Sequence, residues 1–470
     1  QGVAMEIQSL DPQLKVGNDA MWLGVFDRLT KYDANLKPQP VLAESWDISP
    51  DAKQITLHLR KGVTFHSGRE FTSDDVKYSM QRAANPKVAA AQYTGMASTF
   101  TGVDTPDKYT AVLKSDSPKP TVFDLLEFLN IGDKNSLEGP NAKTTAVGTG
   151  PFTFVEWVSG DHVTLAKNKN YWQSGLPYLD SIQIKIFRDQ QAMVAQLEAG
   201  ALDIARFPIL VDFNRLKKDP QYQALLNPLT GAHYEAGFNL TKPPFDNKLL
   251  RQALNYAVDR QRFVDTVLGG VGKAESLPWL AASPAYDAAR ANFYAFDLTK
   301  AAALLKQAGI SSLEFDYMAN PVSAETSGFG QIYQSDLAKL GLKMNIQNYD
   351  NATWVDNVNN HKFNGIYFAS GTYFNLSPST AFLNGKAFNP QLNNSVYKSD
   401  TYTNLINQAA AEVDPAKQKV LYGQLNDLVL DESFTMLISI SPPTLLAKPN
   451  VQGIAWTAHE SPDYLVANLA

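Results

Sequence analysis

The 470-residue chain contains no cysteine. This absence excludes disulfides, thiol nucleophiles, iron–sulfur clusters and cysteine-type zinc sites. No apolar run approaches the roughly 20 residues that a membrane-spanning helix needs. The best candidate, Thr435 to Ala447, is too short and contains Pro442 and Pro443. We therefore expect any work at a membrane to take place outside the bilayer.

Clustered positive charge is also missing. The chain has 41 Lys and Arg residues against 47 Asp and Glu, a formal charge of −6, and no basic run exceeds two residues. A surface that binds nucleic acid needs clustered Lys and Arg to contact the phosphates. The sequence therefore argues against nucleic acid as a partner.

Motifs for catalysis and for metal binding are scarce. The six histidines form no HxxxH or HExxH pair that would present two imidazoles to a metal ion. Gly148-Thr149-Gly150 lacks the third glycine of a dinucleotide-binding loop, and no GxSxG nucleophile elbow occurs. We therefore predict that the protein is not an enzyme and holds no metal or cofactor.

Apolar and aromatic residues, in contrast, are plentiful. They make up 44% of the chain, with 24 Phe, 20 Tyr and 7 Trp, which indicates a globular protein. A chain of this length is expected to form two or three domains, each with its own core. The first residue is Gln1 rather than Met, which suggests that a leader has been removed.

Strand and helix patterns alternate along the chain. Apolar and polar residues alternate over Gln54–Arg60, His162–Lys167 and Ser181–Phe187, which predicts three half-buried strands. One helix is expected to begin at Ser73, with the Ser73 hydroxyl as its cap. Another is expected from Gln190 to Ala199, before Gly200.

The clearest architecture lies between Leu313 and Ala369. Its elements are predicted in the order β-α-β-α-β: a strand at Leu313–Ala319, a helix ending at Gly341, a strand at Lys343–Tyr349, a helix at Asn351–Asn360, and an apolar run at Gly365–Ala369. This order predicts an α/β fold with parallel strands covered by helices. Such sheets bind ligands beyond the carboxyl ends of their strands.

An aromatic segment follows the last of these strands. Aromatic side chains suit the lining of a cleft because they bury much area at low entropy cost. The candidate ligand-binding residues are Tyr367, Ser370, Gly371, Thr372, Tyr373, Phe374 and Asn375. Alternation along a strand would place about half of the rings in the core. Trp354 would either cap the pocket or pack with its helix.

A series of short motifs runs through the chain in a fixed order. The most specific is the block from Leu57 to Val76. The others are Ser9-Leu10-Asp11-Pro12, Phe26-Asp27-Arg28-Leu29-Thr30, Pro40 to Trp46, Gly148 to Phe152, Asn170-Tyr171-Trp172, Pro244-Phe245-Asp246, Arg251-Gln252-Ala253 and Ala301 to Gly309. In this order they resemble the family 5 extracellular solute-binding proteins of ABC transporters, the peptide and nickel binding-protein group.

The resemblance implies a two-lobed periplasmic binding protein fold of the type II-like kind. Lobe 1 would consist of residues 1–237 and 438–470, with an extra subdomain at about 48–157, and lobe 2 of residues 238–437. Two crossing strands, near Ala236–Leu240 and Thr435–Ile440, would join the lobes. The ligand would be enclosed between the lobes.

The implied function is to capture a peptide or other small organic solute and to deliver it to the membrane subunits of an ABC permease. The implied location is the periplasm, or the cell surface if a lipid-bearing cysteine preceded Gln1. We expect a monomer. The alternatives are a receptor for an oligosaccharide, an aromatic acid or a metal chelate, a sensory module with the same clamp, and an enzyme on an α/β scaffold.

The resemblance also bears on the ligand. It implies contacts from Asn18, Met21 and Trp22, just after the Ser-Leu-Asp-Pro motif. Peptide-binding members carry an aspartate in the loop equivalent to Ser370 to Pro378, whereas this chain has no Asp or Glu between His361 and Ser399. A neutral or polar ligand is therefore favoured. A peptide with a free amino group would need an acid from elsewhere, such as Asp350 or Glu235.

Overall fold

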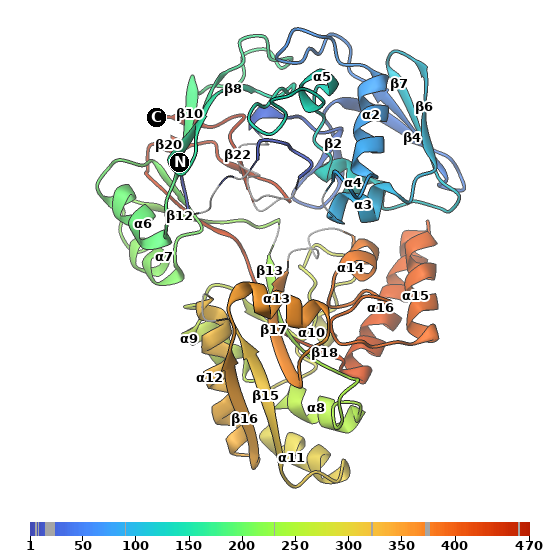
Figure 1. The fold of residues 1–470 in the computed structure, drawn as a ribbon, viewed down its shortest axis with the longest axis vertical. Coiled ribbons are helices and arrows are strands. Elements are labelled where there is room, and N and C mark those ends of the chain that lie inside the picture. Colours follow the sequence, from blue (N-terminus) through green and yellow to red (C-terminus); the bar gives the residue numbers. More distant parts are fainter. Residues whose placement is uncertain are drawn as a thin grey trace. The chain divides into compact units, whose positions relative to one another are not determined.

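The chain folds into two units. The computed structural model describes residues 1–4, 7, 9–14, 24–89, 91–229, 231–320, 323–371, 377–458 and 461–470. Unit 1 comprises Gln1–Thr230 and Pro443–Ala470, and unit 2 comprises Gly231–Pro442 (Figure 1). The expected lobe boundaries fall inside strands β13 (Ala232–Phe238) and β18 (Thr435–Ser441), which pair with each other within unit 2.

Unit 1 is built around a seven-stranded sheet. In spatial order its strands are β12 (Gln223–Leu226), β19 (Thr444–Ala447), β11 (Ile204–Arg206), β1 (Gly2–Val3), β10 (Ser181–Ile186), β9 (His162–Lys167) and β8 (Phe152–Val158). Strands β9 and β10 confirm two of the predicted strands. β19 lies between β11 and β12, so residues after unit 2 complete the sheet.

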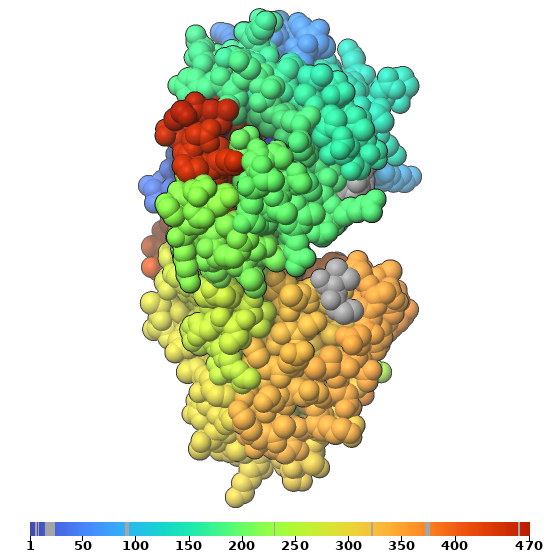
Figure 2. Space-filling view, turned by 90° about the vertical axis from the view of Figure 1, so that its left-hand side faces the viewer, coloured from blue at the N-terminus to red at the C-terminus, as the bar shows by residue number. Residues whose placement is uncertain are grey.

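Helix α6 (Gln190–Glu198) also confirms a prediction, since Gly200 follows it with a φ of +80°. Helix α7 (Leu210–Leu216) follows after strand β11. Figure 2 shows the C-terminal residues, in red, on the surface of unit 1 beside the green segment that contains these helices. In the C-terminal segment, β20 (Val451–Gln452) pairs with β23 (Asn468–Leu469), and β21 (Ala455–Trp456) pairs with β22 (Pro462–Asp463).

A second sheet in unit 1 has its own core. Its strands are β4 (Ala43–Ile48), β5 (Gln54–Leu59), β7 (Thr110–Lys114) and β6 (Gly102–Asp107), in that spatial order. The sheet packs with α2 (Ser73–Ala83), α3 (Ala91–Ala97) and α4 (Val122–Phe128), and the nearby elements are α5 (Lys134–Leu137), β2 (Thr30–Tyr32) and β3 (Pro38–Pro40). β5 confirms the strand predicted at Gln54–Arg60.

The predicted cap of α2 is wrong by one residue. Thr72, not Ser73, is the N-cap, and its backbone N–H donates to the Asp75 carboxylate at 2.9 Å. The Ser73 hydroxyl instead donates to the carbonyl oxygen of Asp107 at 2.6 Å. The helix therefore starts where predicted, but with a different residue satisfying the free backbone groups at its end.

Unit 2 contains a six-stranded sheet. Its spatial order is β14 (Lys273–Ala274), β18, β13, β17 (Gly365–Gly371), β15 (Leu313–Ala319) and β16 (Leu342–Asn348). β15 is parallel to β16 and β17, and the chain passes through α12 (Ala324–Ala338) and α13 (Asn351–Asn359) between them. The predicted β-α-β-α-β unit is thus confirmed. Strand β13 pairs antiparallel with both β17 and β18.

Helices cover this sheet (Figure 1). Phe263 of α9 (Arg260–Thr266) makes an edge contact with Phe368 of β17, and Phe329 of α12 makes a tilted one. The remaining helices of unit 2 are α8 (Lys248–Tyr256), α10 (Ala288–Ala291), α11 (Leu298–Gln307), α14 (Pro378–Asn384), α15 (Asp400–Ala411) and α16 (Pro415–Glu432). Within the described ranges, no helix combines the length and apolar character needed to cross a bilayer.

Candidate functional site

The carboxyl ends of four parallel strands lie at one edge of the unit 2 sheet. β15, β16 and β17 end at Ala319, Asn348 and Gly371. β18 ends at Ser441 and runs parallel to β17, because β13 pairs antiparallel with both. This is the edge at which the sequence predicted the ligand, and ligands of open α/β sheets bind at such an edge.

Several predicted ligand-binding residues lie outside the described residues. These are Asn18, Met21 and Trp22 after the first motif, and Thr372, Tyr373, Phe374 and Asn375 after β17. Their roles stay predictions. The described residues nearest to the second group are Ser370 and Gly371, at the end of β17.

Tyr367 lies inside the core of unit 2. Its side chain is fully buried, and its ring packs edge-to-face with Phe363 at 5.6 Å. It pairs across the ladder with Gly237, and a Cβ at position 237 would lie 2.5 Å from the Tyr367 ring. The ring therefore fills the space that a glycine leaves open. Its predicted contact with a ligand stays a prediction.

Ser370 and Gly371 lie on the edge itself. Ser370 is exposed and pairs with Tyr234, whereas Gly371 pairs with His233. A Cβ at position 371 would lie 2.4 Å from the imidazole of His233, so the histidine ring lies directly against the backbone where β17 ends. Only glycine permits this close approach without a shift of the histidine.

Glu235 is buried and already has a partner. Its carboxylate lies 3.2 Å from Nε2 of His233, and both side chains are almost completely buried. Both residues belong to β13. Because the imidazole also lies against Gly371, this pair supports the backbone at the start of the predicted binding loop. A direct contact of Glu235 with a ligand stays a prediction.

Asp350 and Trp354 lie at the start of α13. The exposed carboxylate of Asp350 caps this helix, accepting hydrogen bonds from the backbone N–H and the hydroxyl of Thr353. These hydrogen bonds lower the pKa of Asp350, which keeps it ionised at neutral pH. Trp354 packs beside Met318 and donates from Nε1 to the Met318 carbonyl oxygen at 3.4 Å.

Glu275 also lies in this sheet region, and the sequence analysis did not single it out. It directly follows β14, and its side chain is 7% exposed. No local pattern marks the residue, because β14 has only two residues and joins the sheet through pairing with the distant strand β18.

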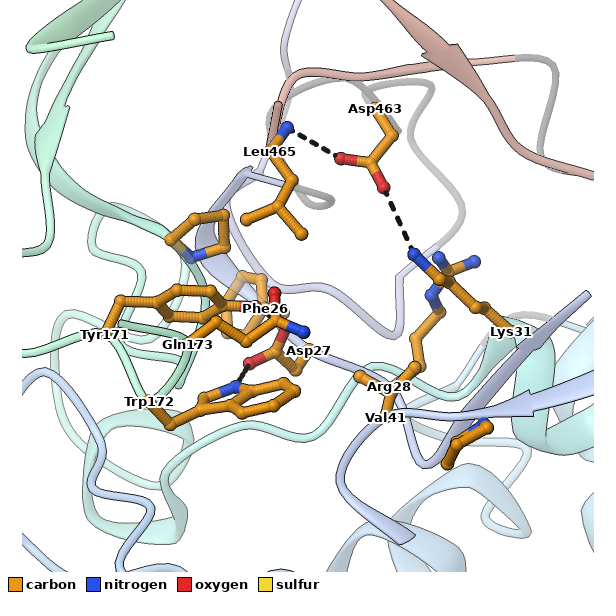
Figure 3. A pocket seen from close by; sticks show the side chains of 12 residues that line it. Phe26, Asp27, Arg28, Lys31, Val41, Tyr171, Trp172, Gln173, Asp463 and Leu465 are labelled. Carbon is orange, nitrogen blue, oxygen red and sulfur yellow. Dashed lines mark hydrogen bonds and ion pairs between the residues drawn. The ribbon is translucent and has the colours of Figure 1, made fainter. Parts of the chain in front are cut away.

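A pocket in unit 1 involves the motif Phe26-Asp27-Arg28 (Figure 3). Its volume is about 40 Å³, room for no more than a few water molecules. Asp27 accepts hydrogen bonds from the Trp172 indole at 2.9 Å, the Thr149 hydroxyl at 3.1 Å and the Tyr171 hydroxyl at 3.2 Å. Burial raises the pKa of Asp27 to about 6. The pocket is too small for a solute.

The other motif residues are also engaged in structural contacts. His66 donates from Nε2 to the carbonyl oxygen of Gly150 and accepts at Nδ1 from the backbone N–H of Gly148, at 3.0 and 3.4 Å, in the tautomer that satisfies both contacts. Arg69 pairs with both Asp75 and Asp133. These contacts tie the block at 57–76 to two other loops of unit 1. In the described part of the chain, no cluster of three His, Asp or Glu residues is placed to hold a metal ion.

Comparisons with known proteins fit this arrangement. The family model "Bacterial extracellular solute-binding proteins, family 5 Middle" matches residues 37–391, about three quarters of the chain. The chain belongs to this family. It is therefore a solute-binding component of an ABC importer, as the motifs implied, and its place of action is extracytoplasmic.

Individual relatives differ in what they bind. Heme-binding protein A of Haemophilus influenzae is 28% identical over 461 residues, covering 91% of this chain and 84% of the relative. Di/tripeptide-binding protein 1 of Pseudomonas aeruginosa is 28% identical over 451 residues, covering 88% and 83%. The solved structure of the PBP AgaA with agropinic acid, from A. tumefaciens R10, is 26% identical with a TM-score of 0.84, covering 100% of this chain and 98% of that one. The α/β periplasmic binding protein fold is thus confirmed.

Proposed function

We propose that the protein captures a peptide or another small organic solute between its two units and hands it to the membrane permease as a monomer. The observation that carries this proposal is the family match across residues 37–391, which spans parts of both units. The two units would act as the closing lobes. Closure would remove water from the solute and strengthen each polar contact inside.

A peptide is the leading ligand, because a relative of 28% identity is a di/tripeptide-binding protein. Relatives of similar identity are named for heme and for agropinic acid, so identity alone does not select the solute. The alternative solutes are an oligosaccharide, an aromatic acid and a metal chelate. The proposed location is the periplasm, or the cell surface for a lipid-anchored form.

The purified protein supplies a direct test. Denaturation releases any trapped solute, and mass spectrometry of the filtrate identifies its class. Thermal-shift measurements with short peptides, sugars, aromatic acids and nickel chelates then test the class independently. A solute at about 100 times its Kd should stabilise the folded state by about 2.7 kcal/mol. The proposal is contradicted if no compound is released and none of these classes of solute stabilises the protein.

A further inference from the structure

Two side chains cover glycines across the β13–β17 ladder. His233 of β13 pairs with Gly371, and Tyr367 of β17 pairs with Gly237. A Cβ at position 371 would lie 2.4 Å from the imidazole, and one at position 237 would lie 2.5 Å from the Tyr367 ring. Paired residues lie on one face of a sheet, as do residues two apart on a strand, so both rings lie on the same face. Each ring is therefore packed directly against the backbone of the neighbouring strand.

Glu235 lies between these two rings in the ladder. It separates His233 from Gly237 on β13 and pairs with the small residue Ala369 of β17. Its carboxylate lies 3.2 Å from Nε2 of His233. Burial raises the pKa of Tyr367, and the charge of Glu235 raises it further. The row formed by Tyr367, Glu235 and His233 thus runs from the core of unit 2 to the edge of its sheet.

The buried contact between His233 and Glu235 calls for a reason beyond stability. The two residues are 3% and 4% exposed. Burial of a carboxylate and an imidazole costs free energy that their mutual contact does little more than offset, and apolar residues of the same volume often stabilise a fold as well. What the contact adds is direction, because a hydrogen bond weakens steeply outside a narrow range of angles. The contact with Glu235 therefore fixes the orientation of the imidazole.

The imidazole held in this way lies at the edge of the sheet where the ligand is predicted. β17 ends at Gly371 on one side of His233. On the other side β18 provides Ile440 as the partner of His233 and ends at Ser441. Glycine has more conformational freedom than any other residue, so the end of β17 needs a group packed on it to stay fixed. His233 supplies that group between two of the strands whose carboxyl ends form the candidate site.

We propose that His233 is a positioning residue for solute binding: oriented by Glu235, its imidazole fixes the backbone of β17 at Gly371 and thereby the shape of the sheet edge. Glu235 acts through His233 and not as a partner of the solute. This inference rests on the proposed capture of a solute at that edge. Backbone that is fixed before the solute arrives loses less conformational entropy when the solute binds, and this favours tighter binding.

The test combines a substitution at residue 371 with removal of the buried contact. Gly371→Ala is introduced into wild type and into a contact-free protein that carries His233→Ala and Glu235→Gln. Calorimetry measures binding of trialanine, or of the compound released by denatured wild type where trialanine gives no thermal shift. In wild type the added methyl collides with the imidazole, so we expect at least tenfold weaker binding. In the contact-free protein the loss should be less than threefold, because the imidazole is absent. Gly423→Ala, at a glycine of α16 with open space around its Cβ position, is the matched control and should bind as wild type.

Hydrogen exchange reports on the same edge without any solute. In the contact-free protein the amides of residues 369–371 should exchange at least tenfold faster than in wild type, relative to the amides of β15. Leu305→Ala is the control for a general loss of stability, because Leu305 is buried on α11, which packs with α8. This variant should keep the wild-type ratio of exchange between the two strands. A role of the contact in stability alone would change exchange equally in both strands.

The outcomes separate this inference from the proposed function. If Gly371→Ala weakens binding equally in wild type and in the contact-free protein, or leaves it unchanged in both, His233 does not position the sheet edge and the proposed function stands. The same conclusion follows if exchange at residues 369–371 is unchanged in the contact-free protein. If wild type releases no compound and binds none of the screened solutes, the proposed function fails and the inference fails with it.

Discussion

Asp27 illustrates how a single motif residue stabilises unit 1. Its carboxyl group joins three segments, because its hydrogen-bond donors are Thr149, Tyr171 and Trp172. Arg60 lies 4.4 Å above the Trp172 ring, which adds a cation–π contact to the same cluster. Residues of three sequence motifs thus contact one buried carboxyl group. These contacts give the motifs a structural role in packing, without any contact to a ligand.

Asp27 also predicts a pH dependence. Its carboxyl group has a pKa near 3.8 in the unfolded chain, whereas burial raises the pKa to about 6 in the folded protein, so the folded state keeps the proton to a higher pH. The free energy of unfolding of wild type, relative to Asp27→Asn, should therefore fall by roughly 2 kcal/mol between pH 4 and pH 7. Urea unfolding of both proteins at several pH values measures this difference. A difference that stays constant with pH would contradict the raised pKa.

Gly148 carries a second prediction at this scale. A Cβ there would lie 2.1 Å from the carbonyl oxygen of Val25, so Gly148→Ala should lower the free energy of unfolding by about 3 kcal/mol or more. Gly102 has open space around its Cβ position, and Gly102→Ala should change stability by less than about 1 kcal/mol. Thermal or urea unfolding compares the stability of Gly148→Ala and Gly102→Ala. Equal effects would show that the close approach of residue 148 to Val25 does not contribute to stability.

Individual side chains were predicted with mixed success. No sequence pattern predicted the close approach of Gly148 and Gly150 to the backbone of Val25. Trp354 packs against a buried cluster that includes Met318 and Val358, and its role as a cap of the pocket stays a prediction. The surroundings of Tyr367 and Glu275 depend on strands far away in the sequence, so no local pattern reveals them.

At the scale of elements, the motif Pro244-Phe245-Asp246 is linked to Arg251 of α8. The Arg251 guanidinium donates to the carbonyl oxygens of Phe245 and Asp246, at 3.0 and 2.9 Å, and to that of Glu432 at the end of α16. One side chain therefore fastens the loop before α8 to α8 itself and to the C-terminal end of α16.

Removal of this link should destabilise unit 2. Arg251→Gln leaves one buried and two partly buried carbonyl oxygens without this donor, and we expect a loss of about 3 kcal/mol in the free energy of unfolding. Lys248, on the same helix, makes only exposed ion pairs with Asp431 and Glu432, and Lys248→Gln should cost less than about 1 kcal/mol. Urea unfolding monitored by fluorescence compares the stability of Arg251→Gln and Lys248→Gln. If the two variants are equally stable, Arg251 does not stabilise unit 2 by linking the loop before α8 to α16.

The elements themselves were largely predictable where periodicity is strong. β15, α13 and β17 lie within a residue or two of their predicted bounds, because each has a clear pattern and a capping or glycine boundary. The antiparallel strand β13 between β17 and β18 was not predicted as part of this sheet. Its place depends on pairing with residues more than 100 positions away, which alternation within one segment does not encode.

At the scale of the whole molecule, the proposed function requires a change of shape. We expect small-angle scattering to show a smaller radius of gyration when the released solute, or a stabilising solute from the thermal screen, is added in excess. Solute contacts with both units would favour a closed state over an open one. The matched control is a solute of the same charge and size that gives no thermal stabilisation. Identical scattering curves with and without a tightly bound solute would contradict a closing clamp.

The family and the fold class were accessible from the sequence, because the motifs occur in order along most of the chain. The ligand was not, because relatives of similar identity are named with different ligands and the predicted contacts at Asn18, Met21, Trp22 and Thr372 to Asn375 lie outside the described residues. The candidate site is therefore defined by the described strand ends of the unit 2 sheet. Of the predicted residues, the structure places Ser370 and Gly371 at the sheet edge, Glu235 further inside β13 beside His233, and Asp350 and Trp354 at the start of α13.

The pairing of Ala232 with Ser441 brings the two ends of unit 2 side by side. A continuous segment whose two ends lie side by side can be exchanged for another, because the flanking chain keeps its positions. Exchange of residues 231–442 for the matching segment of a relative should therefore yield folded chimaeras, in which a new solute preference is grafted onto an unchanged host.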